Sequence, residues 1–398
     1  MEQMRDSGDS TRPPSCAERV AFSVFKYYPY GGSQMEMLRL AGEFTARNIE
    51  VVIYCMVCEE PVLPPGVSCR VIPVRGVSNY RKISRFSEKL AGELAKEKFL
   101  AHIAFNRIPS ADWLYESDLP FADVSSARSW WEKFTPRYRT FAAMEKEIFS
   151  PDGKCRIFCV SNGQKRVFQS IYNTPDCRMH LLPPGISKDF AQAAGLRQKR
   201  DELREEVGVG ENDILLIQIT SAFFARGVDR SIAALAALPE NIRQRTRLLV
   251  VGRDNPSAYR KFAYRCGVGR QVIFAGGRSD VAELITAADL MIHPARSEAS
   301  GSSLLEALAC GTPVLCSGNC GFAPLVREAG NPVLPGRFRQ KLLNRTLMVM
   351  LSTPDKLADL QSEAENYGRS ADFYQRYVFA AETILADAVK RGRMADNL

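Results

Sequence analysis

The chain has 398 residues, of which 45% are hydrophobic and 25% are charged, a composition typical of a globular protein with about two domains. It contains no run of eighteen or more apolar residues, which excludes a membrane-spanning helix. Lysine and arginine outnumber aspartate and glutamate by 53 to 45, and this small, dispersed surplus favours acidic small molecules or an anionic lipid surface over nucleic acid.

The first eighteen residues, MEQMRDSGDSTRPPSCAE, are polar and lack the apolar core of a signal peptide. A segment of this composition buries too little apolar surface to fold. We therefore expect a disordered tail and a protein that stays in the cytoplasm. The first apolar run follows at residues 20–25 and predicts a strand.

That strand leads into the sequence KYYPYGGS, which contains Gly31 and Gly32. A helix is predicted from about residue 34 to 46, followed by a strand at residues 51–55. A glycine-rich turn between a strand and a helix has the shape of a nucleotide-binding unit, although these glycines do not spell G-x-G-x-x-G. The alternative is a tight turn that needs glycine for its positive φ.

Eleven cysteines are scattered without disulfide-like regularity. Cys55, Cys159 and Cys316 lie in apolar runs typical of buried thiols in a reducing compartment. Cys55-x-x-Cys58 is a single pair with no second pair at zinc-finger spacing, and no Asp-x-Asp occurs. The sequence therefore predicts no metal site.

The next predicted elements are a strand at residues 71–74, a basic helix at 80–98 and a strand at 101–105. The last strand runs into NRIPSAD, which contains Asp112, and Asp118 follows shortly after. Acidic residues beyond the carboxyl end of a strand are where site residues collect in open α/β sheets. As a single signal, Asp112 is more typical of a cap or a turn than of a catalytic residue.

A helix is predicted at residues 136–149. Aromatic residues beside arginines are typical of a membrane interface. They also suit a groove packed against another domain, and both interpretations stay open. Five such residues surround the start of this helix: Trp130, Trp131, Phe134, Arg137 and Arg139.

After a strand at residues 156–160, the proline-rich segment LLPPG marks a domain boundary. Beyond it a charged helix at 197–206 begins a second alternation of strands and helices, and after Cys316 we expect helices only. Two such runs indicate two facing doubly wound α/β domains, residues 19–183 and 184–369, with a ligand cleft between them. We expect the last helix, at about 370–390, to pack back on the first domain. The second run comprises strands at 214–219, 247–251, 272–274 and 290–292 and helices at 230–238, 258–266 and 281–287.

The segment DLMIHPARSEASGSSLLEALACG contains a buried strand, a loop of small residues and a helix. Glu298 lies in the loop and Glu306 in the helix. A helix that begins at the carboxyl end of a parallel strand attracts phosphate, and carboxylates beside it can hydrogen-bond sugar hydroxyls. The alternative is structural: Ser303-x-x-Glu306 is also a capping box, and Glu298 would then be a solvated loop residue.

Five motifs in this order carry a resemblance to a known family: FKYYPYGGSQ, AFNRIPSAD, LLPPGIS, RGVDRSI and HPARSEASGSSLLEAL, the last with a Glu-x7-Glu pair. From about residue 19 to the last helix, the chain resembles the family 4 retaining glycosyltransferases of the GT-B fold. It is most similar to the lipopolysaccharide core glucosyltransferase I group, which glucosylates the inner-core heptose.

The resemblance implies a GT-B fold of two Rossmann-like domains and a hexosyltransferase that retains configuration. The donor would be UDP-glucose, the acceptor a lipid-linked core oligosaccharide, and the location the cytoplasmic face of the inner membrane. Neither a metal nor another cofactor is implied. The aromatic and basic residues around residues 130–139 would contact the anionic membrane.

The resemblance also implies individual roles. Arg226 would bind the diphosphate, Glu306 the ribose and Glu298 the donor sugar, while the turn at Arg278 would meet the uracil. Glu298, Arg226 and Asp112 are the implied catalytic residues, and Asp112 would orient the acceptor. The implied acceptor site consists of Glu36, Asp112 and Asp118. The implied donor site consists of Gly31, Gly32, Arg226, Arg278, Glu298, Ser300, Gly301, Ser302, Ser303 and Glu306.

The chain departs from the family pattern at three places. Phe190 follows Asp189 where a basic residue is usual, so one diphosphate-facing cation is replaced, and Lys188 is a candidate to compensate. A glycine-rich turn before Arg226 reads Thr-Ser-Ala, and Glu36 replaces an aspartate. A catalytically silent sugar-nucleotide-binding protein is therefore the alternative function. A nicotinamide-dependent oxidoreductase would need the glycine fingerprint that this chain lacks.

Overall fold

The chain divides into two compact units. The first consists of Met1–Glu116, Ser129–Ile157 and Ala380–Leu398, and the second of Ser117–Arg128 and Phe158–Phe379. The computed structural model describes residues 18–28, 32–59, 63–122, 130–190, 200–210 and 212–394. The predicted N-terminal tail lies outside these ranges up to residue 17. No helix within these ranges is long and apolar enough to cross a membrane.

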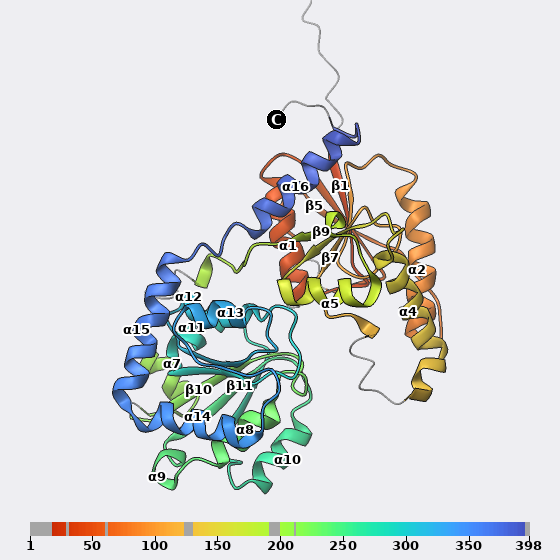
Figure 1. Ribbon diagram of the computed structural model, residues 1–398. Helices are drawn as coiled ribbons and strands as arrows, with labels where there is room; N and C mark the ends of the chain where they lie inside the picture. The colour runs from red at the N-terminus through yellow and green to blue at the C-terminus, as the bar shows by residue number, and fades with distance from the viewer. Residues whose placement is uncertain are drawn as a thin grey trace, which may run out of the picture. The chain divides into compact units, whose positions relative to one another are not determined.

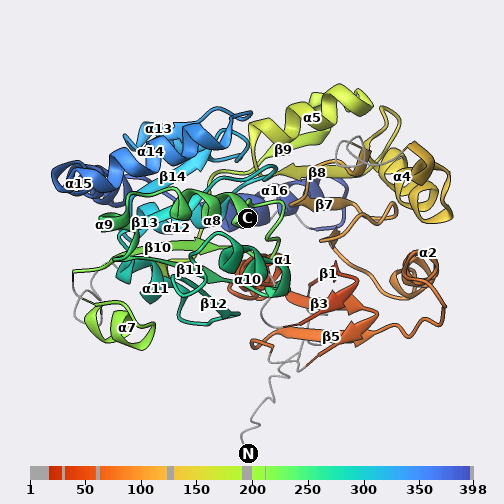
Figure 2. The same cartoon turned by 90° about the horizontal axis from the view of Figure 1, so that it is seen from below.

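The first sheet has seven strands in the order β5-β3-β1-β6-β7-β8-β9. β1 pairs in parallel with β3 on one side and with β6 on the other. β1, β3 and β5 lie side by side in Figure 2. β1 and β3 are buried almost throughout. Because both faces of such a strand are covered, its successive residues are apolar instead of alternating with polar ones. The strands are β1 (Arg19–Ser23), β3 (Glu50–Cys55), β5 (Val67–Val71), β6 (His102–Ala104), β7 (Trp113–Glu116), β8 (Arg156–Cys159) and β9 (Met179–Leu181).

Amphipathic helices connect the strands of this sheet. α2 buries Ile83, Phe86 and Leu90, which recur at helical spacing on one face, while its other face is charged. A separate two-stranded sheet pairs β2 in parallel with β4. These elements are β2 (Lys26–Tyr27), α1 (Gly32–Thr45), β4 (Val57–Cys58), α2 (Asn79–Leu94), η1 (Trp130–Phe134), α4 (Pro136–Phe149), α5 (Asn162–Tyr172) and η2 (Asp176–Arg178).

The second sheet has six strands in the order β12-β11-β10-β13-β14-β15, and every pairing is parallel. Counted along the chain this is the order 3-2-1-4-5-6 of a doubly wound sheet, whose ligand crevice lies where the order reverses. Here that switch point lies between β10 and β13. The strands are β10 (Ile214–Ile219), β11 (Thr246–Val251), β12 (Val272–Gly276), β13 (Leu290–His293), β14 (Val314–Ser317) and β15 (Val333–Leu334).

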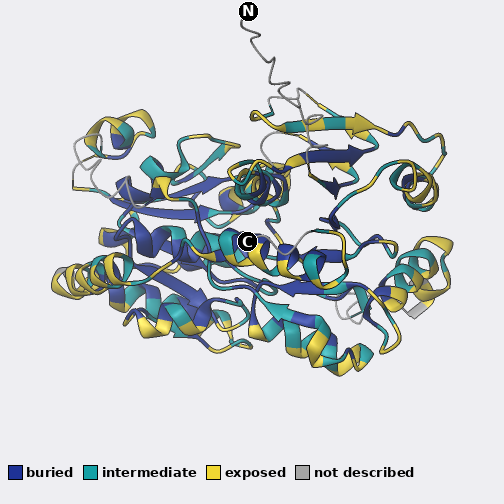
Figure 3. Cartoon of the chain, turned by 90° about the horizontal axis from the view of Figure 1, so that it is seen from above, coloured by how far each residue is buried: buried dark blue, intermediate teal, exposed yellow. Residues whose placement is uncertain are grey.

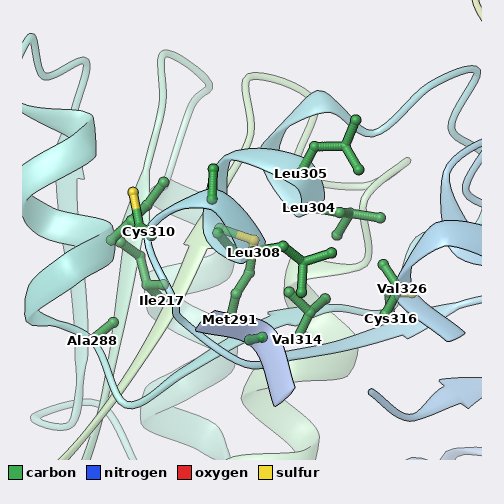
Figure 4. Close-up of a cluster of buried hydrophobic side chains, with 14 of the residues drawn as sticks. Ile217, Ala288, Met291, Leu304, Leu305, Leu308, Cys310, Val314, Cys316 and Val326 are labelled. Atoms are coloured by element: carbon green, nitrogen blue, oxygen red, sulfur yellow. The ribbon is translucent and has the colours of Figure 1, made fainter. Parts of the chain in front are cut away.

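Helices cover both faces of the second sheet and enclose two hydrophobic clusters. Figure 4 shows one cluster, in which Leu304 and Leu308 of α12 lie over Met291 and Val314 of the strands. Full burial of each such side chain stabilises the fold by about 1.5–3 kcal/mol. In Figure 3 most strands are buried, and many of the exposed residues lie on the outer faces of the helices. The helices are α7 (Arg200–Glu206), α8 (Val228–Ala236), α9 (Glu240–Arg243), α10 (Ser257–Arg265), α11 (Val281–Ala287), α12 (Ser302–Ala309), α13 (Ala323–Glu328), α14 (Gln340–Ser352) and α15 (Pro354–Ser370).

The last helix, α16 (Arg376–Lys390), continues beyond residue 380 as part of the first unit (Figure 1). Asp387 forms an ion pair of 2.6 Å with Arg156 of β8, and Arg391 forms an ion pair with Asp112. These contacts fasten the C-terminal segment to the strands of the first unit.

The predicted α/β fold is confirmed by the two parallel sheets, while several predicted elements need correction. β5 spans Val67–Val71, upstream of the strand predicted at 71–74, and β7 lies in a segment for which no strand was predicted. β15 follows Cys316, where only helices were expected. Edge strands and very short strands are missed because they carry no sustained apolar run.

Candidate functional site

Two loops meet at the switch point of the second sheet. The loop after β10 contributes Ala225, whose carbonyl oxygen accepts hydrogen bonds from the backbone N–H groups of Arg296 (2.7 Å) and Ser297 (3.3 Å) in the loop after β13. Gly227 lies in the left-handed region with φ of 73°, and an added Cβ would lie 2.4 Å from the carbonyl oxygen of Pro294. Only glycine therefore permits this close approach of the two loops.

Arg226 and Glu298, predicted as separate donor ligands, are in direct contact. The Nε of Arg226 forms an ion pair with the Glu298 carboxylate, and its Nη1 donates to the carbonyl oxygen of Ser297. The Glu298 side chain is only 11% exposed, and Nε2 of His293 lies 3.5 Å from the same carboxylate. A cation and an anion are thus held together at the carboxyl ends of β10 and β13.

The backbone that carries Arg226 is fixed from the sheet. Gln218, fully buried in β10, donates from its amide nitrogen to the carbonyl oxygen of Arg226 at 2.8 Å. The hydroxyl of Ser231 in α8 donates in turn to the Gln218 amide oxygen at 2.7 Å. The second bond is buried and the first is partly buried, so they restrict the loop more than fully solvent-exposed bonds would.

The backbone around Glu298 is held from its other side. The N–H of Gly321 donates to the carbonyl oxygen of Glu298 at 3.2 Å, and the hydroxyl of Ser161 donates to that of Ala299 at 2.6 Å. An added Cβ on Gly321 would lie 2.0 Å from the Ala299 oxygen, so this position also requires glycine. Glu298 is therefore held by the loop after β14 as well as by Arg226.

Helix α12 begins beside this pair, with Gly301 as its N-cap at φ of 87° and no side-chain capping bond. Ser303 lies inside the helix, so it is not the N-cap that the capping-box alternative requires. Ser302 and Ser303 are half-buried at its start, and Glu306 is half-buried in the following turn. The first N–H groups of a helix have no acceptor within the helix, so this end suits a phosphate.

A second ion pair joins the loop after β13 to the start of α8, and sequence reasoning missed it. Arg296 donates to both carboxylate oxygens of Asp229 at 2.8 and 2.7 Å, and its guanidinium lies 4.3 Å from the ring centroid of Phe224. Hydrogen bonding to Asp229 raises the pKa of Arg296. Both charged residues were visible in the RGVDRSI and HPARSEA motifs, but no sequence signal paired them. His293 was likewise visible and overlooked.

Arg278 follows β12, where the resemblance places the uracil. Its guanidinium donates to Asp280 at 2.8 and 2.6 Å and to Glu206 at 2.9 Å. Hydrogen bonds to Asp280 and then to Glu206 raise the pKa of Arg278. The side chain is thus engaged by two carboxylates, and its contact with a nucleobase stays a prediction.

Phe190, at the position where the family usually has a cation, lies in the hydrophobic core of the second unit. Its side chain is only 8% exposed and belongs to the same buried cluster as Ile186 and Cys310. Lys188 is exposed. The substitution therefore adds packing to the core, and Arg226 is the cation that contacts Glu298.

The site residues predicted within residues 19–183 do not come together in one place among the described residues. Gly31 lies outside the described residues, and Gly32 is the first residue of α1. Glu36, one turn further, accepts a hydrogen bond from the hydroxyl of Tyr115 in β7. Asp118, which belongs to the second unit, is exposed, and its carbonyl oxygen accepts a bond of 2.7 Å from Gln164.

Asp112 precedes β7 and lies beside His102, the first residue of β6, so it is at the amino end of these strands. Its carboxylate accepts hydrogen bonds from the His102 N–H (3.0 Å), from Arg393 (2.7 Å) and from Arg391. Burial raises the pKa of Asp112, but the bonds from Arg393 and His102 and the two arginine charges outweigh it and lower the pKa. These contacts give Asp112 a structural role at the edge opposite to the carboxyl ends, and we leave it out of the proposed mechanism.

The aromatic and basic residues near α4 lie on the surface. Trp131 is 56% exposed and Phe134 is 62% exposed, and Arg137 and Arg139 in the first turn of α4 are also exposed. The side chain of Trp130 lies outside the described residues. Neither of these two rings is therefore buried within the described part of its own unit.

Comparisons with known proteins agree with this geometry. A family model described as glycosyl transferases group 1 matches residues 199–367. The lipopolysaccharide glucosyltransferase WaaG of Escherichia coli K12 is 34% identical over 92% of this chain and 98% of its own length. A D-inositol 3-phosphate glycosyltransferase of Xylanimonas cellulosilytica is 31% identical over 76% of this chain and 79% of its own.

Solved structures give the same result. The crystal structure of WaaG, a glycosyltransferase involved in lipopolysaccharide biosynthesis, superposes with a TM-score of 0.88 over 92% of this chain and 99% of that one. The structure of Anabaena Alr3699/HepE in complex with UDP and glucose has a TM-score of 0.70 at 16% identity, over 94% of this chain and 100% of that one. At that identity the second match concerns the fold alone.

Proposed function

The chain belongs to the glycosyl transferases of group 1, and from that premise we propose that it moves glucose from UDP-glucose onto a heptose of the lipopolysaccharide inner core with retained configuration. The observation that carries this proposal is the chain-long similarity to the lipopolysaccharide glucosyltransferase WaaG. The direct contact of Arg226 with Glu298 at the switch point supports it further.

In the proposed reaction the bond between the anomeric carbon of glucose and the β-phosphate oxygen breaks, and UDP departs. An acceptor hydroxyl oxygen forms the new bond on the same face of the sugar. The hydroxyl proton passes to the departing phosphate oxygen, so no protein base is needed. Negative charge therefore grows on the β-phosphate as an oxocarbenium-like centre forms on the sugar.

Arg226 and the N-terminal N–H groups of α12 would stabilise that growing charge. Each preorganised donor of this kind contributes about 3–4 kcal/mol to lowering the barrier. With these groups present, the proposed reaction uses no metal and no other cofactor. Glu298 would hold the hydroxyls of the transferred sugar and Glu306 those of the ribose.

A catalytically silent sugar-nucleotide-binding protein is not favoured. The departures that suggested it, Phe190 and the altered turn before Arg226, leave the Arg226–Glu298 pair intact, with Phe190 in the core. An oxidoreductase is excluded by the membership of the chain in a transferase family.

The test measures UDP release from UDP-glucose with and without a heptose-containing core acceptor, and UDP-galactose serves as the donor control. We expect acceptor-dependent release with UDP-glucose, and NMR of the product should show the anomeric configuration of the donor. Binding of UDP-glucose without release at any acceptor concentration would identify a silent binding protein. Faster release of UDP from UDP-galactose than from UDP-glucose would show that the donor is UDP-galactose.

We also propose that the protein binds peripherally to the cytoplasmic face of the inner membrane through Trp131, Phe134, Arg137 and Arg139. Exposed aromatic rings insert at a lipid interface and arginines attract anionic headgroups at about 1 kcal/mol each. Sedimentation with vesicles tests both parts. Arg137→Ala/Arg139→Ala should reduce binding to anionic vesicles, and Trp131→Ala/Phe134→Ala binding to neutral ones. If both variants bind anionic and neutral vesicles as strongly as the wild type does, this surface is not the membrane contact.

A further inference from the structure

Three cysteine thiols converge in the first unit, and none of them has a role in the proposed reaction. Among the described residues, Cys55, Cys58 and Cys69 form the one group whose side-chain ligand atoms all lie within 4.8 Å of one another. The Sγ atoms of Cys55 and Cys69 are 3.5 Å apart. Cys55 is buried, and the other two are half-buried, so the cluster is accessible from solvent.

Strand pairing produces this cluster. In the parallel ladder between β3 and β5, Cys69 lies opposite Ile53, and Cys55 follows two residues after Ile53. Because side chains alternate between the two faces of a strand, Cys55 and Cys69 share one face. Cys58 comes from β4, which pairs with β2 next to Tyr27 and also contacts β5.

The spacing of the thiols matches a metal site. Sulfur ligands at about 2.3 Å from a tetrahedral zinc ion lie roughly 3.8 Å from one another. The three thiols lie within 4.8 Å of one another, and the Sγ atoms of Cys55 and Cys69 are 3.5 Å apart, so small side-chain movements would place all three on one ion. Thiolate ligands select soft or borderline cations such as Zn²⁺ over Mg²⁺ or Ca²⁺.

We propose that Cys55, Cys58 and Cys69 bind one Zn²⁺ ion, with water in the fourth coordination position. On binding, the ion replaces the thiol protons, so up to three protons are released to solvent. The sequence argument against a metal considered only the spacing of Cys55-x-x-Cys58, whereas the third ligand comes from the neighbouring strand.

A zinc ion at this position would join β3, β4 and β5. β4 pairs with β2 at Tyr27, and the Gln34 side chain of α1 donates to the carbonyl oxygen of Lys26 in β2 at 3.0 Å. β2 and α1 flank the glycine-rich segment that the sequence predicts to approach the diphosphate. The ion would therefore act as a structural support, and we expect it to raise the melting temperature of the protein.

The experiment measures zinc content and Co²⁺ spectra of the full-length protein purified under reducing conditions. Cys58→Ser removes the ligand on the shortest strand, and Cys177→Ser is the matched control because Cys177 is an exposed cysteine of the second unit. We expect about one equivalent of zinc in the wild type and the control, and at least tenfold weaker binding in Cys58→Ser. Co²⁺ should give thiolate charge-transfer bands and the bands of a tetrahedral site in the wild type and in Cys177→Ser, but not in Cys58→Ser.

A second readout covers the case in which Cys58→Ser folds poorly. In the wild type, zinc should slow alkylation of Cys58 and leave alkylation of Cys177 unchanged. Zinc content below one tenth of an equivalent after reconstitution, or Co²⁺ bands that persist in Cys58→Ser, would overturn the proposal. A Cys55–Cys69 disulfide in the freshly reduced protein would also overturn it. None of these measurements uses transferase activity, so their failure leaves the proposed function untouched.

Discussion

Arg226→Ala is the substitution that best separates a catalytic ion pair from a structural one. In the structure Arg226 contacts the Glu298 carboxylate and the carbonyl oxygen of Ser297. Removing the guanidinium leaves Glu298, 11% exposed, with Nε2 of His293 at 3.5 Å as its remaining neighbour among the described ion-pair partners. The loss of this partner from a nearly buried carboxylate should lower the free energy of unfolding by about 1–3 kcal/mol.

The catalytic loss should be larger than the loss of stability. If Arg226 stabilises the charge that grows on the β-phosphate, Arg226→Ala should lower kcat by about a hundred- to thousandfold, or roughly 3–4 kcal/mol. Changing Glu298→Gln in the same chain removes the uncompensated charge. The double variant Arg226→Ala/Glu298→Gln should therefore recover most of the lost melting temperature and none of the lost kcat.

Arg296→Ala is the matched control, because Arg296 lies in the same loop as Glu298 and also pairs with a carboxylate, that of Asp229 at the start of α8. It should lower the melting temperature by a similar amount and kcat by less than tenfold. Melting curves, donor KM and kcat are measured on all four proteins. Equal losses of kcat in Arg226→Ala and Arg296→Ala would refute the reasoning, because both ion pairs would then serve only to hold the loops together.

Three further substitutions test the remaining assignments. Glu306→Ala should raise the donor KM by tenfold or more through the lost ribose contact, while the melting temperature stays within a few degrees; unchanged UDP affinity in calorimetry would contradict the ribose role. Phe190→Lys should destabilise the protein by several kcal/mol in urea unfolding and should not raise kcat, because it places a charge in the core. Asp112→Asn should lower the melting temperature at pH 7. Because the folded pKa of Asp112 is lowered, this difference is fully present above about pH 4 and should disappear as the pH falls through the folded pKa; a constant difference would disprove the role of its charge.

The central strands of the second unit could be predicted from the sequence almost to the residue. β10 has the sequence ILLIQI and spans Ile214–Ile219, as expected, because a central parallel strand covered on both faces reads as a continuous apolar run. β5 has the sequence VSCRV at the edge of its sheet, with mostly exposed or half-buried residues, and it was placed several residues too late. The more completely a strand is buried, the more continuous is its run of apolar residues, and the more closely its bounds can be predicted.

The contact between Arg226 and Glu298 could not be derived from local pattern. Each residue lies in its own motif, and the motifs are separated by β11, α10, β12 and α11 along the chain. They meet because β10 pairs directly with β13 at the switch point, which is a property of strand order. The same limit applies to Cys69, which reaches Cys55 only through the pairing of β5 with β3.

The geometry of Arg226 explains why an ion pair is compatible with donor binding. A guanidinium has five N–H groups on three nitrogens. Nε is used by Glu298 and Nη1 by Ser297, so among the described residues Nη2 has no hydrogen-bond partner. A phosphate bound at Nη2 would leave the pair to Glu298 intact, so the carboxylate proposed to hold the sugar and the cation proposed to bind the phosphate would keep one fixed orientation. A site fixed before the donor arrives needs little reorganisation as charge moves to the leaving phosphate, and under the proposed mechanism this is the condition that would let one arginine replace two cations.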